Sequence, residues 1–176
     1  MFANPEENVA RLHLKEREKV ADFGAGTGAY AIAAGKVVGR NGSVYAVEVQ
    51  DTLLPRIANA AREAGLSNVK TLWGDIEELG GTSIPDNIID ALILSNVLFQ
   101  AEDIHALFEE VRRVLKPGGR VLVVEWRDSF NGLGPQPDMI VSPSSVQDTC
   151  SRGGFSEKES FDAGEHHYGF IFEKTS

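Results

Sequence analysis

The sequence predicts an α/β protein built on a doubly wound, mainly parallel sheet. Apolar strand-like runs alternate with helix-like stretches along most of the chain, the first run is followed at once by alternating glycines, and two strand-like runs end the chain. Strands that alternate with helices are typical of parallel sheets covered by helices on both faces. The 176 residues suit one domain with a sizeable core. We therefore expect a single domain over 1–176, with a short helical cap over 1–18 and the core over 19–174.

The first half of the chain is predicted to contain three strands and three helices. Proline at a first helical position, with asparagine before it, predicts a helix from Pro5 to Leu14 with Asn4 as its N-cap. In chain order, the other predicted elements are the strand Lys19 to Phe23, the helix Gly28 to Val38, the strand Ser43 to Glu48, a helix that begins after Asp51 as N-cap and ends at Gly65, and the strand Val69 to Trp73.

The second half is predicted to continue this alternation and then to break it. After a turn or short helix over Asp75 to Leu79, the run Ile88 to Leu94 is apolar almost throughout, which indicates a central strand covered on both faces. The next predicted elements are a helix from Glu102 to Leu115, a stop at Pro117-Gly118-Gly119 and a strand from Arg120 to Trp126. The last are a loop from Asn131 to Pro143, a helix from Ser144 to Arg152, and the antiparallel strands Gly154 to Phe161 and His166 to Lys174 around a turn at Asp162-Ala163-Gly164.

Composition and charge exclude several classes of protein. The formal net charge is −9 and the isoelectric point about 4.9, so phosphate backbones repel the chain and we expect no nucleic-acid partner. The single cysteine, Cys150, cannot form an internal disulfide and fits a reducing compartment. No apolar run approaches about 18 residues, so we expect no membrane span. The N-terminus has no apolar signal-peptide core. We therefore predict a cytoplasmic protein.

The run from Val20 to Gly28 indicates a nucleotide-like ligand. An apolar strand ends in an acidic residue and is followed by Gly24, Gly26 and Gly28, which permit a tight turn and leave room for the ligand. These glycines and the alanine after them also fit the fingerprint of dinucleotide-binding proteins. Asp22 favours a different ligand, because a carboxylate repels a pyrophosphate but attracts an ammonium and a sulfonium. An NAD-dependent oxidoreductase is kept as a less favoured interpretation.

Four segments, in a fixed order and at family-like spacing, carry a resemblance to a known family. They are the loop Asp22 to Gly28, Glu48 at the end of its strand, Gly74-Asp75 after Val69 to Trp73, and Leu115-Lys116-Pro117-Gly118-Gly119 leading into Arg120 to Glu125. Together they resemble the class I S-adenosylmethionine-dependent methyltransferases, in their quinone-biosynthesis and general small-molecule branch. The resemblance covers Lys19 to Lys174. It implies a Rossmann-like seven-stranded sheet in the order 3-2-1-4-5-7-6, with strand 7 antiparallel in a C-terminal hairpin.

The resemblance implies S-adenosyl-L-methionine as the cofactor and S-adenosyl-L-homocysteine as the product. Open parallel sheets bind ligands at the carboxyl ends of their strands. There Glu48 can accept both ribose hydroxyls, and Asp75 can accept the adenine amine while the Ile76 N–H donates to a ring nitrogen. In the family, the position of Asp22 acts near the methionine end, and the residues after the fourth strand hold the amino group. The predicted cofactor-binding residues are Asp22, Gly24, Ala25, Gly26, Gly28, Glu48, Val49, Asp75, Ile76, Ser95 and Asn96.

The predicted reaction is methyl transfer to a small-molecule acceptor by in-line displacement. This reaction mainly needs the nucleophile, the methyl carbon and the sulfur to be aligned in a dry pocket. A general base is needed only where the acceptor must first lose a proton. The catalytic residues are left open, and Glu125, Asp128, His105 and His166 are weak candidates for a base. A non-catalytic S-adenosylmethionine-binding or scaffold protein with the same fold is the main alternative.

The acceptor and its pocket are the least determined features. The stretch Ser95-Asn96-Val97-Leu98 lacks the Asn-Pro-Pro-Tyr-like loop of enzymes that methylate amines of nucleic acids or proteins. Oxygen, carbon, sulfur and small-amine acceptors stay open, whereas the single cysteine argues against arsenic methylation. The segment before the first strand is short, so we expect a shallow pocket, or one completed by the N-terminal helix, the loop Asp128 to Pro143 or a second subunit of a homodimer. His166 and His167 would lie on opposite faces of a strand, and no metal site is predicted.

Overall fold

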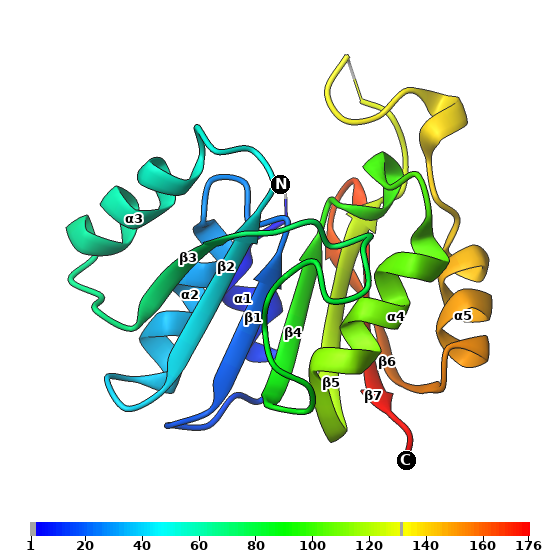
Figure 1. Ribbon diagram of the computed structural model, residues 1–176. Coiled ribbons are helices and arrows are strands. Elements are labelled where there is room, and N and C mark those ends of the chain that lie inside the picture. The colour runs from blue at the N-terminus through cyan, green and yellow to red at the C-terminus, as the bar shows by residue number, and fades with distance from the viewer. Residues whose placement is uncertain (1–2, 131) are drawn as a thin grey trace.

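The described residues of the computed structural model, 3–130 and 132–176, form a seven-stranded sheet with helices on both faces (Figure 1). Residues 1–2 of the predicted cap and Asn131 of the predicted loop lie outside the described residues. The strand order is β3-β2-β1-β4-β5-β7-β6. Only the pairs of β7 with β5 and with β6 are antiparallel. The predicted strand order and the antiparallel seventh strand are therefore confirmed.

The elements alternate as predicted through the first five strands. The strands are β1 Lys19–Phe23, β2 Ser43–Glu48, β3 Val69–Trp73, β4 Ile89–Ser95, β5 Leu115–Trp126, β6 Phe155–Gly164 and β7 His167–Lys174. The α-helices are α1 Pro5–Ala10, α2 Ala29–Val38, α3 Leu54–Glu63, α4 Ile104–Val114 and α5 Pro143–Arg152. Two short 3-10 helices, η1 Leu98–Gln100 and η2 Pro137–Met139, are additions that the sequence pattern did not indicate. Among the described residues, no helix is both long and apolar enough to cross a membrane.

Helix caps explain where several helices begin. The Asn4 side chain accepts hydrogen bonds from the N–H groups of the first turn of α1, which confirms the predicted N-cap. Asp103 caps α4 in the same way, through a 3.0 Å bond from the Ala106 N–H. Asp51 was predicted to cap α3, and this is wrong: α3 has Leu53 as N-cap with no side-chain cap bond. Gly65 follows the end of α3 with a φ of +73°, as the predicted helix stop requires.

Other predicted boundaries also differ from the structure. α1 ends at Ala10, four residues before the predicted Leu14. The segment Pro117-Gly118-Gly119 does not separate α4 from β5, because β5 already begins at Leu115, and the β4–β5 register shifts between Ile89 and Ala91. The hairpin turn lies at Glu165-His166 instead of 162–164. β6 continues through the predicted turn to Gly164, which pairs with His167, and β7 begins at His167, one residue later than predicted.

Alternate residues of each strand contribute to two separate hydrophobic layers. In β1, Val20 packs in the layer under α1, α2 and α3, whereas Ala21 and Phe23 pack in the layer under α4 and α5. Side chains alternate between the two faces of a strand, so Asp22 lies on the α2 side of the sheet. Both layers are needed because β1 and β4 are covered on both faces, which is why the β4 run is apolar almost throughout.

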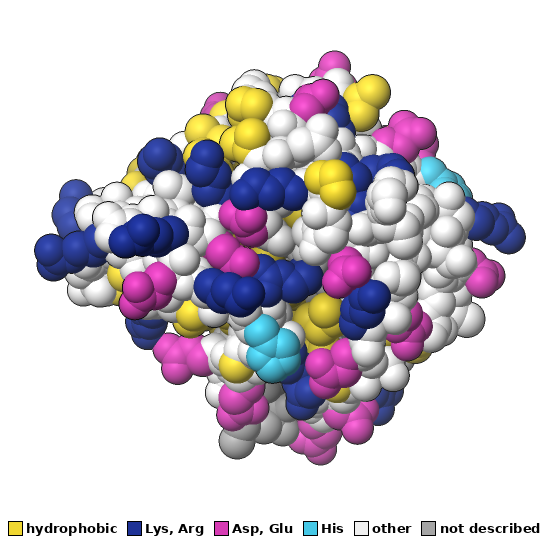
Figure 2. All heavy atoms as spheres, turned by 90° about the horizontal axis from the view of Figure 1, so that it is seen from below, with side chains coloured by type: hydrophobic (Ala, Val, Ile, Leu, Met, Phe, Trp, Pro, Cys, Tyr) yellow, Lys and Arg dark blue, Asp and Glu magenta, His cyan; other side chains and the backbone are white. Residues whose placement is uncertain are grey.

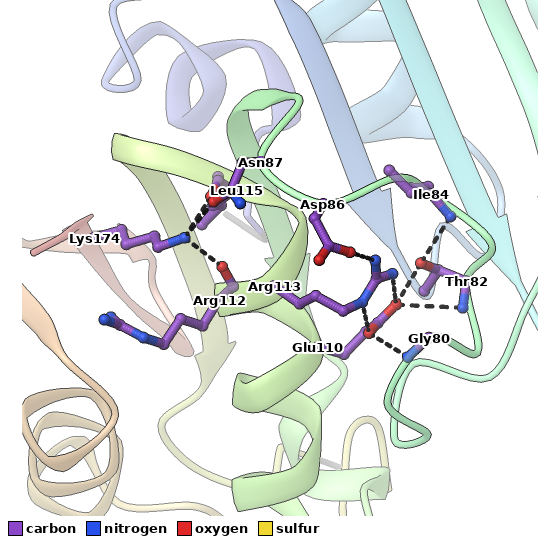
Figure 3. Close-up of polar contacts among 10 residues, drawn as sticks. All are labelled: Gly80, Thr82, Ile84, Asp86, Asn87, Glu110, Arg112, Arg113, Leu115 and Lys174. Carbon is purple, nitrogen blue, oxygen red and sulfur yellow. Dashed lines mark hydrogen bonds and ion pairs between the residues drawn. The ribbon is translucent and has the colours of Figure 1, made fainter. Parts of the chain in front are cut away.

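The segment 74–88 replaces a helix between β3 and β4 and crosses one face of the sheet (Figure 1). Ile84 from this segment belongs to the layer under α4 and α5. Glu110, a fully buried residue of α4, binds the segment (Figure 3). Its carboxylate accepts hydrogen bonds from the Gly80 N–H at 2.7 Å and from the Thr82 hydroxyl at 2.5 Å. The segment is thus fixed to α4 through one carboxylate.

Arg113 completes the charge balance around Glu110. Its Nε and Nη2 each donate to the Glu110 carboxylate at 2.7 Å, and Nη1 donates to Asp86 at 2.5 Å. Burial acts to raise the pKa of Glu110, but the hydrogen bonds from Arg113, Thr82 and Gly80 outweigh it and hold the pKa below its ordinary value. Glu110 is therefore ionised at neutral pH.

Lys174 of β7 forms a second buried anchor in the same view (Figure 3). Its Nζ donates to the Leu115 carbonyl at 2.6 Å, to the Arg112 carbonyl at 2.7 Å and to Asn87 Oδ1 at 2.9 Å. A cation near the last carbonyls of a helix is favourable, because these groups carry partial negative charge. Lys174 thereby joins the end of α4 to the sheet.

The face seen from below in Figure 2 carries mixed charge. Lysine and arginine side chains alternate there with acidic ones instead of gathering in one patch. Two ion pairs lie near the starts of β4 and β5: Lys116 with Asp90 at 2.5 Å, and Arg120 with Glu18 at 2.6 Å. The Lys116 side chain is 45% exposed, and a surface pair of this kind contributes little to stability, whereas the Arg120 and Glu18 side chains are only 20% and 17% exposed.

Gly28→Ala is expected to lower the free energy of unfolding by about 2–4 kcal/mol. Gly28 has a φ of +82°, and a Cβ there would lie 2.9 Å from Ile57 Cγ2 of α3, so backbone strain and overpacking add. Gly65→Ala is the matched control, because its φ is +73° but a Cβ would meet nothing within 4 Å. Urea unfolding should give a loss of only about 1–2 kcal/mol there. Equal losses would show that contact with α3 is unimportant.

Candidate functional site

A cavity of about 470 Å³ lies at the carboxyl ends of β1, β2, β3 and β4. This volume falls within the usual range for small-molecule sites. Ten of the eleven predicted cofactor-binding residues line the cavity; they are Asp22, Gly24, Ala25, Gly26, Glu48, Val49, Asp75, Ile76, Ser95 and Asn96. Residues that follow β1, β2, β3 and β4, far apart in the sequence, therefore meet at one site.

The glycine loop after β1 is held against β2. The N–H groups of Gly24 and Ala25 both donate to the Val47 carbonyl, at 2.9 and 3.0 Å. Gly24, Gly26 and Gly28 all have left-handed φ angles, which explains the spacing of the glycines. Gly28 is the predicted site residue outside the cavity lining: it is the N-cap of α2 and packs against α3.

Glu48 is a buried carboxylate that joins the ends of β1 and β2. Its Oε2 accepts from the Gly26 N–H at 3.0 Å, and its Oε1 accepts from the N–H groups of Val49 and Gln50 at 2.9 and 3.0 Å. An ionised carboxylate offers about four acceptor positions. Glu48 can therefore hold the glycine loop in place and still accept a hydrogen bond from a ligand hydroxyl.

Asp75 lies half-buried at the end of β3 and faces the same cavity. One oxygen, Oδ1, accepts from the Glu77 N–H at 2.9 Å, as an N-capping carboxylate would. Asp75 thus fixes its own turn with one oxygen, which leaves the other for a ligand amine. Thr82 packs directly against the start of this turn, since a Cβ at Gly74 would lie 2.9 Å from the Thr82 Cα.

Two buried acceptor atoms in the cavity wall lack a hydrogen-bond partner. They are Asp22 Oδ2 and Asn96 Oδ1. Burial, with a contribution from Glu48, raises the pKa of Asp22 to about 7, against a hydrogen bond from the Ala31 N–H. A buried acceptor without a donor is costly, so these atoms fit a ligand that carries a cationic donor. This is the chemistry expected at the methionine end of the predicted cofactor.

Tyr30 links the cavity wall to the N-terminal helix. Its side chain lines the cavity, and its hydroxyl accepts a 3.1 Å hydrogen bond from Asn8 of α1. Asn8 also donates to the Ala163 carbonyl of the C-terminal hairpin at 3.2 Å. Burial raises the pKa of Tyr30, against hydrogen bonds with Asn8 and Ser95. In the described part of the chain, α1 contributes to the cavity only through this support, since no residue of α1 is in its lining.

The four weak candidates for a general base are not among the described residues that line the cavity. Glu125 is buried at the end of β5, and His105 is exposed on α4. His166 lies in the hairpin turn, with Nδ1 2.7 Å from Asp128 Oδ1. His167 begins β7, so the two histidines do not sit at adjacent strand positions. Within the described ranges, no group of three or more His, Cys, Asp or Glu side chains is arranged to hold a metal ion.

Sequence reasoning missed part of the cavity lining. The additional lining residues are Thr27, Ala29, Tyr30, Val47, Gln50, Leu53, Gly74, Glu77, Val97, Gln100 and Ala101. Most are neighbours of predicted residues, so a wider window around each strand end would have found them. Tyr30 could have been found as the second residue of the helix that follows the glycine loop.

The chain belongs to the methyltransferase domain family, whose model matches residues 14–169. It is 29% identical over 120 residues to a demethylmenaquinone methyltransferase from Geobacillus sp. (strain WCH70), a match that covers 68% of this chain and 50% of that protein. It is 32% identical over 118 residues to the ubiquinone/menaquinone biosynthesis C-methyltransferase UbiE of Proteus mirabilis (strain HI4320), covering 64% and 44%. The chain therefore spans about half the length of these curated relatives.

A solved structure supports the same assignment. A SAM-dependent methyltransferase from Aquifex aeolicus superposes with a TM-score of 0.87 at 26% sequence identity, covering 97% of this chain and 89% of that one. The prediction of a class I S-adenosylmethionine-dependent methyltransferase is confirmed. S-adenosylmethionine is the cofactor that this family membership assigns to the chain. The two orphaned acceptors, the Glu48 carboxylate and the half-buried Asp75 fit that cofactor.

Proposed function

We propose that this protein transfers a methyl group from S-adenosylmethionine to a small-molecule acceptor. The observation that carries the proposal is the meeting of Asp22, Glu48, Asp75 and Asn96 in one cavity behind a left-handed glycine loop. Taken in the strand order β4-β1-β2-β3, the groups match the cofactor from one end to the other. Asn96 and Asp22 match its amino end, Glu48 its ribose and Asp75 its adenine. Glu48 would accept from the ribose hydroxyls, Asp75 and the Ile76 N–H would bind the adenine edge, and Asp22 would face the methionine end.

The protein's part in the reaction is positioning. When bound, S-adenosylmethionine supplies a methyl group that its sulfonium already activates for displacement. The glycine loop would bring its backbone close to the ligand because no side chain intervenes at Gly26, where the nearest neighbour of an added Cβ is the Gly24 carbonyl oxygen at 3.9 Å. Tyr30 and Ser95 line the cavity near Asp22 and would exclude water from the methionine end. Alignment of this kind supplies a large part of the rate enhancement for a two-substrate displacement.

We infer that the acceptor is a small aromatic or quinone-like molecule that is methylated on carbon. The two curated relatives are named for methylation of demethylmenaquinone and for C-methylation in ubiquinone and menaquinone biosynthesis. The described part of the cavity lining contains no lysine, arginine or histidine, so no cation is offered there to an anionic acceptor. A homodimer and a cytoplasmic location stay predictions.

Calorimetric titration with S-adenosylmethionine, S-adenosylhomocysteine and NAD tests the cofactor. We expect micromolar binding of both sulfur ligands and no binding of NAD. Formation of S-adenosylhomocysteine with a panel of quinols, phenols and small amines then tests turnover. Binding without turnover across the panel would favour the non-catalytic alternative, and binding of NAD alone would overturn the proposal.

Glu48→Ala and Asp75→Ala are each expected to weaken S-adenosylhomocysteine binding by about 1–3 kcal/mol. Each variant removes a hydrogen bond to a charged group, and Glu48→Ala also frees the Gly26 N–H. Glu63→Ala, an exposed acid on α3, is the matched control and should leave the affinity unchanged. Calorimetry on the three variants would contradict the cofactor geometry if both cavity variants bound as tightly as the control.

A further inference from the structure

Glu125, the second-last residue of β5, is a fully buried carboxylate next to the cavity wall. Its Oε2 accepts from the Leu98 N–H at 2.9 Å and from the Phe99 N–H at 3.4 Å. Its Oε1 accepts from the Trp126 N–H at 2.8 Å. These donors are backbone groups, and those of Leu98 and Phe99 belong to the segment after β4, at the start of η1. The Val97 N–H also favours the ionised form of Glu125. No ligand role is assigned to this acid by its position, since it is outside the cavity lining.

The segment that Glu125 holds, residues 95–101, forms one wall of the cavity. Ser95, Asn96 and Val97 line it, followed by Gln100 and Ala101. The chain turns sharply here, because Asn96 has a left-handed φ of +56°, an uncommon conformation for a residue with a side chain. Such a turn persists only where surrounding contacts hold it.

The same segment also contacts the glycine loop. A Cβ at Gly24 would lie 2.8 Å from Val97 Cγ2, so Val97 packs directly on the loop backbone. The Gln100 side chain closes the turn with a 2.9 Å hydrogen bond to the Asn96 carbonyl. Movement of the segment would therefore displace Val97 from Gly24 and Asn96 from the methionine end of the cavity.

We propose that Glu125 is a positioning residue of the proposed methyltransferase, which holds the segment 95–101 against the glycine loop and thereby sets cofactor affinity. It acts through Leu98 and Val97 and does not touch the ligand. The carboxylate form is required, because two oxygens must accept from donors on opposite sides. In Glu125→Gln, the side-chain amide NH₂ would replace one oxygen and face a backbone N–H, so two donors would meet without an acceptor.

The surroundings of Glu125 leave its charge uncompensated. Burial raises the pKa of Glu125 to about 7, although four backbone N–H groups favour the ionised form. The titratable groups that face it are Tyr168, its partner on β7, and beyond that Cys150 on α5. Burial raises the pKa of both, so neither is charged near neutral pH. Protonation of Glu125 below about pH 7 removes acceptor capacity from the segment.

Hydrogen exchange tests the anchoring without any ligand. In Glu125→Gln, the Leu98 and Phe99 amides should exchange at least about tenfold faster than in the unchanged protein, because each loses a charge-assisted bond. Val146→Ala, which removes buried atoms from α5, is the control for a general loss of stability. Unchanged exchange of the two amides in Glu125→Gln, or equal acceleration in both variants, would overturn the proposal.

Binding of S-adenosylhomocysteine tests the consequence for the cavity. At pH 8 we expect Glu125→Gln to bind roughly tenfold more weakly, and Val146→Ala to bind as tightly as the unchanged protein. Between pH 8 and pH 6, the affinity of the unchanged protein should fall by a larger factor than the affinity of Glu125→Gln. Asp22 titrates in both proteins, so its effect on affinity cancels when the two are compared. Equal affinity and equal pH dependence would overturn the proposal. Failure of the unchanged protein to bind would instead reject the proposed function, while hydrogen exchange still decides the anchoring.

Discussion

Glu110→Ala is expected to lower the free energy of unfolding by about 3–5 kcal/mol, the usual cost of breaking a buried ion pair by removing one partner. The variant leaves Arg113 partly buried with only Asp86 to pair with, and leaves the Gly80 N–H and Thr82 hydroxyl without their acceptor. Urea unfolding, followed by tryptophan fluorescence and circular dichroism at pH 7, measures the loss.

Glu109→Ala is the matched control for this variant. Glu109 precedes Glu110 on α4 and is exposed, and its replacement by alanine changes the intrinsic helix propensity by the same amount. We expect an effect within about 0.5 kcal/mol for the control. Because residues 81 and 82 pack against Gly74, Glu110→Ala should also weaken binding at the adenine end of the cavity. Similar stability of the two variants would show that the buried network does not hold the segment 74–88.

The bounds of the first three strands were predicted correctly because residues next to each strand determine where it begins and ends. β1, β2 and β3 begin and end where predicted, since each run is bounded by glycine, asparagine or an acid. The hairpin turn was misplaced because Asp162-Ala163-Gly164 is a good local turn sequence, whereas pairing of Asp162 with Tyr168 and of Gly164 with His167 extends β6 through it. Local turn preference was outweighed by tertiary hydrogen bonds.

The start of α3 shows how the site itself alters a helix boundary. Asp51 is a good N-cap by its residue type, but Glu48 accepts from the Val49 and Gln50 N–H groups and holds the chain along the cavity. The helix can begin only after Leu53, which also lines the cavity. A deviation from local preference near a ligand site is expected where function constrains the backbone.

The candidate site was predicted from four sequence segments because parallel strands bring their carboxyl ends together. The anchors of the site could not be predicted in the same way. Glu110 contacts residues about 30 positions away, and Glu125 contacts residues 26 and 27 positions away. Nothing in the sequence near an acid on a helix or at a strand end indicates such distant partners. Only the folded arrangement identifies them as supports of the cavity wall.

Asp22→Asn is expected to stabilise the ligand-free protein and to weaken cofactor binding. The pKa of Asp22 is raised from an ordinary 3.8 to about 7, so the folded state keeps a proton that the unfolded state has lost. Stability therefore falls as the pH rises from about 4 to about 7, by on the order of 4 kcal/mol in total. The amide has a smaller desolvation cost, so the variant should gain roughly 2 kcal/mol at pH 8 and almost nothing at pH 4.

Asp51→Asn is the control, because Asp51 is exposed beside the same cavity and should show neither effect. Urea unfolding at pH 4, 6 and 8 measures the first effect, and titration with S-adenosylmethionine at pH 8 measures the second. We expect at least about a tenfold loss of affinity in Asp22→Asn, since the ionised carboxylate no longer faces the ligand's cationic groups. A stability gain without a loss of affinity would mean that Asp22 is a buried structural acid. Both effects together would show that the stability given up at this position serves ligand binding.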